Sequence, residues 1–298
     1  MAEMKKFRSG FVTIVGRPNV GKSTLMNAMV GEKVAIVSNK PQTTRNRIMG
    51  VMTRDDWQMV FLDTPGIHTP RTKLGNYMMQ SVREAMDGMD GMMVLVDATQ
   101  VGEHDRAIVK EMASKKVPKV LLLNKIDLLQ PEKLLALIAS FADCGYDAII
   151  PISAKTGDGL DILVEELKGM CFESPQLFPD GMISDQPERQ LVAEIIREKL
   201  LQNLDKEVPH GVAVEIEQMK EENGVEHIAA VIYCERKTHK GIIIGKNGAM
   251  LKKIGASARV EIEEMLDCKV FLQLWVKIKE DWRNNPAQIR NFGYSEEG

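Results

Sequence analysis

A glycine-bracketed loop near the N-terminus constrains this chain more than any other part of its sequence. Gly16-Arg17-Pro18-Asn19-Val20-Gly21-Lys22-Ser23 has the pattern G-x4-G-K-S, and it lies between an apolar run over 11–15 and an amphipathic stretch over 22–30. Glycines let the backbone curl so that successive N–H groups point inward, and the positive end of the following helix faces the same point. The loop therefore predicts a phosphate site, in which Lys22 neutralises the β- and γ-phosphates and Ser23 holds Mg²⁺.

The N-terminal half alternates short apolar runs with amphipathic stretches. The expected strands are Phe11–Val15, Trp57–Leu62, Met92–Val96, Lys119–Leu123 and Ile149–Ile152, and the expected helices are Lys22–Val30, Lys73–Met86, Glu103–Lys115, Glu132–Ala142 and Leu160–Met170. Strands that are apolar on both faces and separated by helices predict an α/β domain with a mostly parallel sheet and helices on both faces. One antiparallel edge is also expected, because a short polar turn joins Ile48–Thr53 to the strand that begins at Trp57.

A second polar motif belongs to the phosphate end of the expected site. Asp63-Thr64-Pro65-Gly66 comes directly after the apolar residues 60–62, which places Asp63 at the end of a strand. A carboxylate in that place reaches Mg²⁺ through water, and the Gly66 N–H senses the γ-phosphate. In open α/β sheets, ligands bind at this carboxyl edge of the strands.

Two further motifs follow strands and predict the base that is bound. Asn124-Lys125-Ile126-Asp127 follows the apolar residues 120–123, and Ser153-Ala154-Lys155 follows 149–152. Asp127 accepts hydrogen bonds from the N1–H and exocyclic amine of guanine, whereas adenine would leave this carboxylate unpaired. A backbone N–H of the second motif would meet the guanine O6. The sequence therefore predicts a site for GTP rather than ATP.

With these motifs, residues 10–172 resemble the translational-type P-loop GTPases. The resemblance implies a further threonine that closes over Mg²⁺, and Thr44 is the first choice and Thr43 the second within Pro41-Gln42-Thr43-Thr44-Arg45. It assigns Mg²⁺ to Ser23, Thr44 and Asp63. It assigns the nucleotide, GTP or GDP, to Gly16, Arg17, Pro18, Asn19, Val20, Gly21, Lys22, Ser23, Thr24, Asp63, Thr64, Pro65, Gly66, Asn124, Lys125, Asp127, Ser153, Ala154 and Lys155.

Ile67 departs from the pattern of Ras-like GTPases, which carry at this position a glutamine that orients the attacking water. An isoleucine cannot hydrogen-bond water, so the expected intrinsic rate is slow, on the order of 10⁻⁴–10⁻³ s⁻¹. No catalytic residue is assigned. Some relatives use an asparagine of the phosphate loop to bind K⁺, which makes Asn19 a candidate potassium ligand, and Arg45 is a second candidate for charge stabilisation.

The pattern changes after residue 173. Residues 174–187, with the sequence SPQLFPDGMISDQP, hold three prolines and predict a linker. The elements expected beyond it form an α+β arrangement: a helix over Glu188–Leu201, strands over Gly211–Met219 and Glu226–Arg236, a helix over Ala249–Leu266 and a strand over Lys269–Lys277. The expected divisions are a GTPase domain over 1–173, the linker, a second domain over 188–280 and a loosely packed tail over 281–298.

A GxxG loop in the second domain coincides with a basic run. Gly245-Lys246-Asn247-Gly248 precedes a helix, and residues 236–259 carry seven Lys or Arg and no acid, although the net charge of the chain is −3. The order of elements α-β-β-α-α-β over 188–278, with the GxxG loop between the two central helices, resembles a type II KH fold. In that fold the GxxG loop clamps about four single-stranded nucleotides. The resemblance assigns RNA to Arg236, Lys237, Lys240, Ile242, Ile243, Ile244, Gly245, Lys246, Asn247, Gly248, Lys252 and Lys253, with 242–244 as an apolar floor. A solvated helix connection in an interaction domain is the alternative.

The whole chain resembles the Era family of bacterial GTPases. The resemblance implies binding near the 3′ end of small-subunit ribosomal RNA, assembly of the small ribosomal subunit from its precursor, a monomer, and a cytoplasmic location with peripheral contact to the inner membrane. Two other functions stay open: an RNA-binding protein with GTP as a structural ligand, and a membrane or cell-cycle regulatory GTPase. Widely spaced cysteines argue against a disulfide scaffold, and neither a signal-peptide run nor an apolar stretch of spanning length is found.

Overall fold

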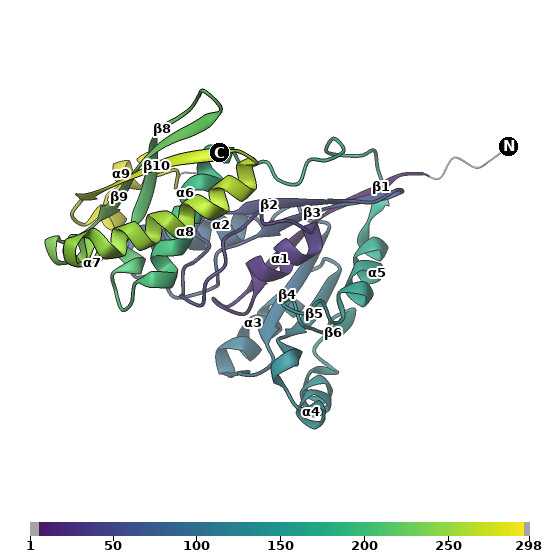
Figure 1. Cartoon of the computed structure of the whole chain (residues 1–298). Helices are drawn as coiled ribbons and strands as arrows, with labels where there is room; N and C mark the ends of the chain where they lie inside the picture. Colours follow the sequence, from purple (N-terminus) through teal and green to yellow (C-terminus); the bar gives the residue numbers. More distant parts are fainter. Residues whose placement is uncertain (1–5, 295–298) are drawn as a thin grey trace. The chain divides into compact units, whose positions relative to one another are not determined.

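The computed structural model describes residues 6–294, and the chain separates into two compact units (Figure 1). The second unit comprises the chain from Gln186 together with segments 36–43 and 70–77, and the rest of the described chain forms the first unit. Two segments of the expected GTPase domain therefore pack with the C-terminal part of the chain. The sequence contains no signal for this grouping, because it depends on contacts between residues far apart in the chain.

The first unit is built on a mostly parallel sheet. Its strands are β1 (Arg8–Gly16), β2 (Ile48–Thr53), β3 (Trp57–Asp63), β4 (Gly91–Asp97), β5 (Lys119–Asn124), β6 (Ala148–Ile152) and β7 (Phe172–Glu173), in the order β2-β3-β1-β4-β5-β6 with β7 beside β1. The β2–β3 pair is antiparallel, which confirms the expected edge. The short β7 was not expected, and it also pairs antiparallel, with Phe172 opposite Ser9.

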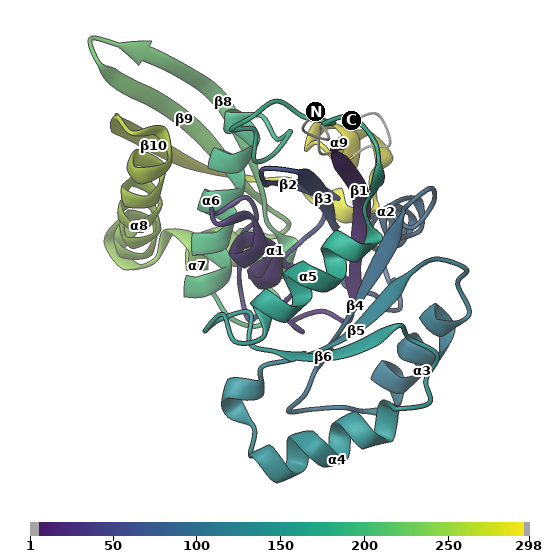
Figure 2. The same cartoon turned by 90° about the vertical axis from the view of Figure 1, so that its right-hand side faces the viewer.

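Helices cover both faces of this sheet, as the sequence predicts. They are α1 (Lys22–Val30), α3 (Glu103–Ala113), α4 (Pro131–Phe141) and α5 (Leu160–Met170), with a 3₁₀ turn η1 (Ile126–Leu128). Helix α2 (Lys73–Glu84) is shared, because its residues up to Tyr77 belong to the second unit and the rest to the first. Leu25 of α1 and Leu163 of α5 pack in one core cluster with β1 and β5, whereas Val109 of α3 and Phe141 of α4 pack in a cluster on the other face. Figure 2 shows α5 and α3 on opposite sides of β4–β6. The central strands are buried on both sides, which is why they are apolar throughout.

The segment between the units is packed rather than free. The Gln58 side-chain oxygen accepts hydrogen bonds from the N–H groups of Leu177 at 3.0 Å and Phe178 at 2.9 Å. Further along, the Ser184 hydroxyl donates to the Met49 carbonyl oxygen at 2.8 Å. Its prolines exclude regular structure, but they do not prevent it from following β2 and β3 along the first unit.

The second unit has the order α-β-β-α-α-β that the sequence predicts. Its elements are α6 (Glu188–Asn203), β8 (Ala213–Glu222), β9 (Val225–Cys234), α7 (Lys237–Ile244), α8 (Ala249–Leu266), β10 (Lys269–Ile278) and α9 (Pro286–Asn291), with 3₁₀ turns η2 (Pro209–Gly211), η3 (Lys246–Gly248) and η4 (Trp282–Asn284). The strand order is β10-β9-β8, with β9 antiparallel to β8 and parallel to β10. Val192 of α6, Ile243 of α7 and Ile254 of α8 share one core cluster with the sheet.

The expectation of a loosely packed tail from residue 281 was wrong for the described part, which ends at Tyr294. Trp282 is 0% exposed, and its indole Nε1 donates to the Gly211 carbonyl oxygen at 3.0 Å. Its ring stands edge-on to Phe292 and stacks on Tyr294, with centroids 5.2 and 6.1 Å apart. Three aromatic side chains therefore anchor a segment whose composition is otherwise mostly polar. Residues 295–298 of the expected tail lie outside the described residues.

Among residues 6–294, no helix has the length and apolar character needed to cross a membrane.

Candidate functional site

The phosphate loop joins the end of β1 to the start of α1, and two of its glycines cannot be replaced without strain. Gly16 has φ 154° and Gly21 has φ 103°, a region of backbone conformation that favours glycine. A Cβ on Gly21 would lie 2.3 Å from the Asn124 side-chain nitrogen, and one on Gly16 would lie 2.5 Å from the Leu95 carbonyl oxygen. The loop therefore curls tightly against the ends of β4 and β5.

Three oxygen-bearing side chains meet at the start of α1. The Ser23 hydroxyl donates to Asp63 Oδ2 at 2.5 Å and lies 2.9 Å from the Thr44 hydroxyl, which itself lies 3.4 Å from the same carboxylate oxygen. Thr43 points elsewhere, since its hydroxyl donates to the Lys40 carbonyl oxygen at 2.7 Å. Of the two candidate threonines, the structure brings Thr44 to Ser23 and Asp63.

This group of oxygens fits a magnesium ion. Asp63 is 0% exposed and its Oδ1 has no hydrogen-bond partner among the described residues, while Lys22 is 6% exposed. Burial raises the pKa of the Asp63 carboxyl and lowers the pKa of the Lys22 amine, and the attraction between the two charges only partly offsets each shift. A buried carboxylate with an unused oxygen beside two hydroxyls is a set of hard ligands of the kind Mg²⁺ prefers.

Asn124 connects the phosphate loop to the motif at 153–155. Its side-chain nitrogen donates to the Val20 carbonyl oxygen at 2.8 Å, and its side-chain oxygen accepts from the Ala154 N–H at 2.9 Å. Lys125, next in the chain, donates to the Asn19 carbonyl oxygen at 2.9 Å. Hydrogen bonds between these two side chains and backbone groups therefore hold the phosphate loop, the end of β5 and the motif at 153–155 together.

The Lys125 side chain also contacts an acid at the end of β4. Its Nζ lies 2.6 Å from Asp97 Oδ2. Burial would raise the pKa of Asp97, but the hydrogen bonds from Lys125 and Thr99 outweigh it and hold the pKa below its ordinary value. Asp97 therefore stays ionised at neutral pH and holds the stem of Lys125 beside the phosphate loop.

Asp127 lies on η1, at the exposed end of the site. Its Oδ1 accepts from the Ser153 hydroxyl at 2.7 Å. The Asp127 side chain is exposed, so its carboxylate is accessible to a ligand. The motifs after β1, β3, β5 and β6 thus lie along one edge of the sheet, as expected for strands that run in parallel.

The other residues assigned to the nucleotide have structural partners. Arg17 pairs with Asp105 at 2.8 Å, and the Thr64 hydroxyl donates to the Ile14 carbonyl oxygen at 2.8 Å. Thr24 lies in the first turn of α1, and Val20 and Pro65 are buried. Arg45 is 2% exposed, so its guanidinium is not presented at the surface of the site.

Gly66 lies against the phosphate loop so closely that only glycine fits there. A Cβ at this position would be 2.5 Å from the backbone nitrogen of Pro18. The next residue, Ile67, donates its N–H to the Gly16 carbonyl oxygen at 3.0 Å, and its side chain packs on the cluster that includes β4 and β5. The Ile67 side chain therefore contributes packing and not a polar group.

We expect Gly66→Ala to weaken binding of a GTP analogue about 5- to 150-fold. The added Cβ would clash with Pro18, and moving the phosphate loop to relieve that clash costs about 1–3 kcal/mol of binding free energy. Gly169→Ala is the matched control, since a Cβ there meets nothing within 4 Å. Fluorescent-nucleotide titration measures both variants. Equal affinities for the two variants would show that the close approach of Gly66 is unimportant.

A groove in the second unit lies between α8 and the edge strand β10. Its volume is about 420 Å³, and it is lined by Gly248, Leu251, Lys252, Gly255, Ala256, Arg259, Leu272 and Leu274. The lining combines three leucines, two positive charges and no acid. Small residues on one face of α8 allow a close approach, so the groove offers an apolar floor with cations at its side.

Only part of the predicted RNA residues lie at this groove. Gly248 and Lys252 line it, whereas Ile243 is 0% exposed and belongs to the core, so its expected contact with bases was wrong. Ile242 is 50% exposed and remains available. The GxxG loop itself is exposed at Lys246 and Asn247, and Gly245 and Gly248 have φ 73° and 78°. Ile244, Lys240 and Lys253 do not line the groove.

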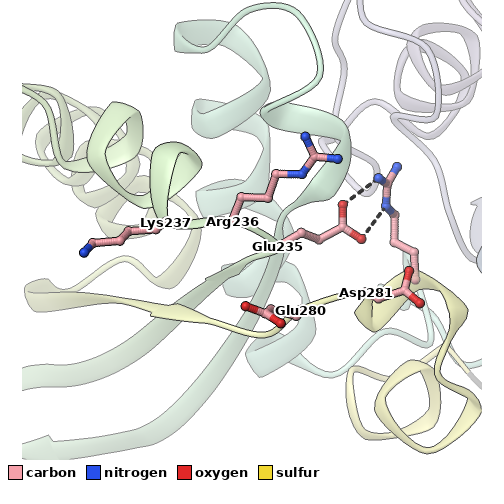
Figure 3. Close-up of a pocket in the computed structure, with 6 residues that line it drawn as sticks. Glu235, Arg236, Lys237, Glu280 and Asp281 are labelled. Atoms are coloured by element: carbon pink, nitrogen blue, oxygen red, sulfur yellow. Dashed lines mark hydrogen bonds and ion pairs between the residues drawn. The ribbon is translucent and has the colours of Figure 1, made fainter.

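Arg236 and Lys237 line a different pocket, shown in Figure 3. This pocket of about 410 Å³ also contains Glu235, Glu280, Asp281 and Arg283. The Glu235 carboxylate accepts from the Arg283 guanidinium at 3.0 and 2.6 Å, and Lys237 extends away from Glu235. Acidic and basic side chains are equal in number here, so the electrostatic attraction for a nucleic-acid phosphate is weaker than in the groove beside α8.

Sequence reasoning named Arg259 only as part of the basic run, and it did not single out the other lining residues Leu251, Gly255, Ala256, Leu272 and Leu274. A signal did exist, because residues 248, 252, 255, 256 and 259 recur at helical spacing and combine small with basic side chains. The leucines of β10 could not be found in this way. Their place at the groove depends on the packing of α8 against β10, which is an edge strand of the sheet. That packing cannot be read from the sequence of β10 alone.

Comparisons with known proteins agree with this arrangement. A family model described as 50S ribosome-binding GTPase matches residues 11–125, and a KH domain model matches residues 207–283. The GTPase Era of Clostridioides difficile is 54% identical over 295 residues, which cover 97% of this chain and 99% of that protein. The GTPase Era of Ruminiclostridium cellulolyticum is 53% identical over 291 residues, or 97% of this chain and 98% of that protein.

Two solved structures are also similar over nearly the whole chain. A crystal structure of Era in complex with MgGDPNP and nucleotides 1506–1542 of 16S ribosomal RNA has a TM-score of 0.93 and 40% identity, and covers 97% of this chain and 99% of that one. A crystal structure of a variant of Aquifex aeolicus Era bound to GDP·AlF4⁻ has a TM-score of 0.93 and 39% identity, with coverage of 97% and 100%.

Proposed function

Because this chain belongs to the GTPase Era family, we propose that it uses GTP binding and hydrolysis to control the capture and release of small-subunit ribosomal RNA near its 3′ end. The chain is a GTPase with a KH domain. The observation that carries the proposal is the meeting of Ser23, Thr44 and Asp63 at the start of α1, within 2.5 to 3.4 Å of one another. Thr44 directly follows segment 36–43, which belongs to the second unit.

The nucleotide is selected and held by the chain itself. Asp127 would accept two hydrogen bonds from guanine, the backbone of 153–155 would meet O6, and the N–H groups of the phosphate loop would surround the phosphates. Lys22 and the start of α1 would add positive charge at the same point. Ser23, Thr44 and Asp63 would hold Mg²⁺, which, when bound, neutralises charge that develops on the phosphates.

The residue after Gly66, Ile67, cannot orient the attacking water. Ile67 packs against the core and provides no hydrogen bond, so the intrinsic rate is expected to be on the order of 10⁻⁴–10⁻³ s⁻¹. Asn19, which lies in the phosphate loop with φ 66°, is the proposed ligand for K⁺, and its amide oxygen is a hard ligand suited to that ion.

The groove beside α8 is the proposed RNA site. Single-stranded bases need an apolar surface to lie on, and the leucines of α8 and β10 provide it. Lys252 and Arg259 would meet the phosphates, and the GxxG loop at 245–248 would close over the backbone. A solved relative contains nucleotides 1506–1542 of 16S ribosomal RNA, which supports the same class of ligand here.

The wider biological role follows from this ligand. We propose that the chain acts as a monomer on the small ribosomal subunit precursor, which would place its work in the cytoplasm. Contact with the inner membrane is a second candidate. It is favoured by the exposed lysines at 246, 252 and 253, because anionic lipid attracts the same charges as RNA.

The affinity for RNA in the two nucleotide states tests the proposal. We expect the protein with a non-hydrolysable GTP analogue to bind the RNA 3′ fragment at least tenfold more tightly than the GDP form, which corresponds to about 1.4 kcal/mol of coupling. Salt is held fixed because phosphate contacts make the affinity depend on it. Equal affinities would instead support an RNA-binding protein with GTP as a structural ligand.

A matched pair of variants locates the RNA. Lys252→Ala is expected to weaken binding in both nucleotide states and to lower the salt slope by about 1, as a lost phosphate contact does. Lys237→Ala removes an equally exposed lysine from the other pocket. If the two substitutions had equal effects, RNA would not be confined to the groove beside α8.

A further inference from the structure

Two backbone groups just before Thr44 are held by side chains of α6. The Glu198 carboxylate accepts a hydrogen bond from the Val37 N–H at 2.7 Å, and the Arg197 guanidinium donates to the Thr43 carbonyl oxygen. The two contacts lie within the second unit, which includes segment 36–43. Since Thr43 and Thr44 are consecutive, fixing the Thr43 carbonyl restricts where the Thr44 hydroxyl can lie.

Both α6 side chains are buried and held by charged neighbours. Arg197 is 0% exposed and its Nε donates to Glu194 Oε1 at 2.7 Å, while Glu198 is 2% exposed and lies 2.9 Å from Lys199 Nζ. Burial alone would lower the pKa of Arg197, but Glu194 outweighs burial and raises it. The guanidinium therefore stays charged, and its geometry is fixed from both sides.

The same series of contacts continues to the helix that lines the RNA groove. Lys199 pairs with Glu261 of α8 as well as with Glu198. Glu261 does not line the groove itself, but it lies on the same helix as Arg259, which does, so a ligand that fixes α8 also fixes the position of Glu261. A continuous chain of ion pairs and hydrogen bonds thus runs from α8 through α6 to the backbone of 37–43. Such a connection is a physical route by which two sites can bias one element.

Segment 70–77 has a similar anchor in the same unit. The Lys73 N–H donates to Asn284 Oδ1 at 3.2 Å, and the ring of Tyr77 lies 6.5 Å from the ring of Tyr294. This segment follows the motif at 63–66 by a few residues. Both segments that lead into or out of the metal-binding residues are therefore held by the second unit.

We propose that Arg197 and Glu198 are positioning residues that couple the RNA groove to Thr44. The proposal rests on the proposed function, because it concerns the route by which RNA and GTP affect each other. RNA seated against α8 fixes Glu261 and Lys199, and these hold the side chains that place residues 37–43. Thr44 is then held beside Ser23 and Asp63, where GTP with Mg²⁺ needs it and GDP does not. Coupling of this kind is reciprocal.

The charged network is well suited to a substitution test. Removing one partner of a buried ion pair usually destabilises a protein, because the other charge is left buried without a partner. That cost is smaller where the remaining charge can reach water. Glu194, the partner of Arg197, has a side chain that is 20% exposed, so its carboxylate can turn to water when the guanidinium is removed. Loss of coupling can therefore be separated from loss of folding.

The experiment measures RNA affinity of the full chain with the GTP analogue and with GDP, in wild type and in Arg197→Met. We expect the preference of RNA for the GTP form to fall from at least tenfold to less than twofold, while the RNA affinity of the GDP form stays unchanged. Arg197→Lys, which can still donate to the Thr43 carbonyl, should restore part of the preference. Arg189→Met is the control, since Arg189 lies on the same helix but donates to carbonyl oxygens of Ile216 and Glu217.

The outcomes separate this inference from the proposed function. A wild type with equal affinities in both states would overturn the proposed function itself, and the coupling route with it. A wild type with the preference and an Arg197→Met variant that keeps it would overturn the route alone. Thermal unfolding is measured first. If Arg197→Met does not fold, Glu261→Ala decides in its place, because it removes the acceptor of Lys199 at a partly exposed side chain of α8, and an unchanged preference there overturns the route.

Discussion

Asp127→Asn is expected to lower the affinity for GTP by about 10²–10⁴-fold and to create a preference for xanthosine triphosphate. The carboxylate would accept from two donors of guanine, and each hydrogen bond to a charged group contributes about 1.5–3 kcal/mol. An asparagine offers one acceptor and one donor, so its amide NH₂ would face the guanine amine. Xanthine has a carbonyl oxygen in place of that amine, and the pairing is restored.

The geometry around Asp127 makes this test selective. Asp127 lies on the exposed turn η1, and one oxygen already accepts from the Ser153 hydroxyl at 2.7 Å. An asparagine oxygen can keep that contact, so the loop need not rearrange. Competition binding of the two nucleotides gives the result. Asp161→Asn, at an exposed position in the first turn of α5, is the control, and equal nucleotide preference in both variants would place the base elsewhere.

Trp282→Ala is expected to lower the free energy of unfolding of the second unit by about 3–5 kcal/mol, the usual cost of removing a fully buried aromatic side chain. The loss combines a cavity between Phe292 and Tyr294 with an unpaired carbonyl oxygen at Gly211. Calorimetry with the GTP analogue present separates the two units, since unfolding of the chain need not be a single transition.

Trp275→Ala is the matched control for this prediction. Trp275 is 43% exposed on β10, and its truncation should cost less than about 1 kcal/mol because little apolar area leaves the core. Equal costs for the two tryptophans would mean that the C-terminal segment does not stabilise the second unit. A loosely packed segment from residue 281 would give that result.

The parts of the fold that the sequence predicted correctly are local ones. The bounds of α1, α5 and α8 match their expected ranges, and β2 and β3 form the expected hairpin. Periodicity, a glycine loop and a short turn are decided by neighbouring residues, so they can be read along the chain. The motifs at strand ends also met at one edge, because parallel strands must end on the same side.

The choice between neighbouring side chains needed the tertiary structure. The family resemblance put Thr44 only narrowly ahead of Thr43, and the structure separates them by which hydroxyl reaches Ser23 and Asp63. Ile242 and Ile243 are equally apolar, yet only Ile243 points into the core. The direction of a side chain on a short helix depends on what packs against that helix.

The sequence by itself determined that the chain carries a guanine-nucleotide site followed by a KH domain, because each depends on short motifs within single strands, loops and helices. Only the tertiary structure decided that Arg197 holds the Thr43 carbonyl, 154 residues away. It also decided that the described segment after residue 281 is packed and that β10 lines the groove beside α8. Contacts between distant residues depend on how whole elements pack, and no local pattern in the sequence records them.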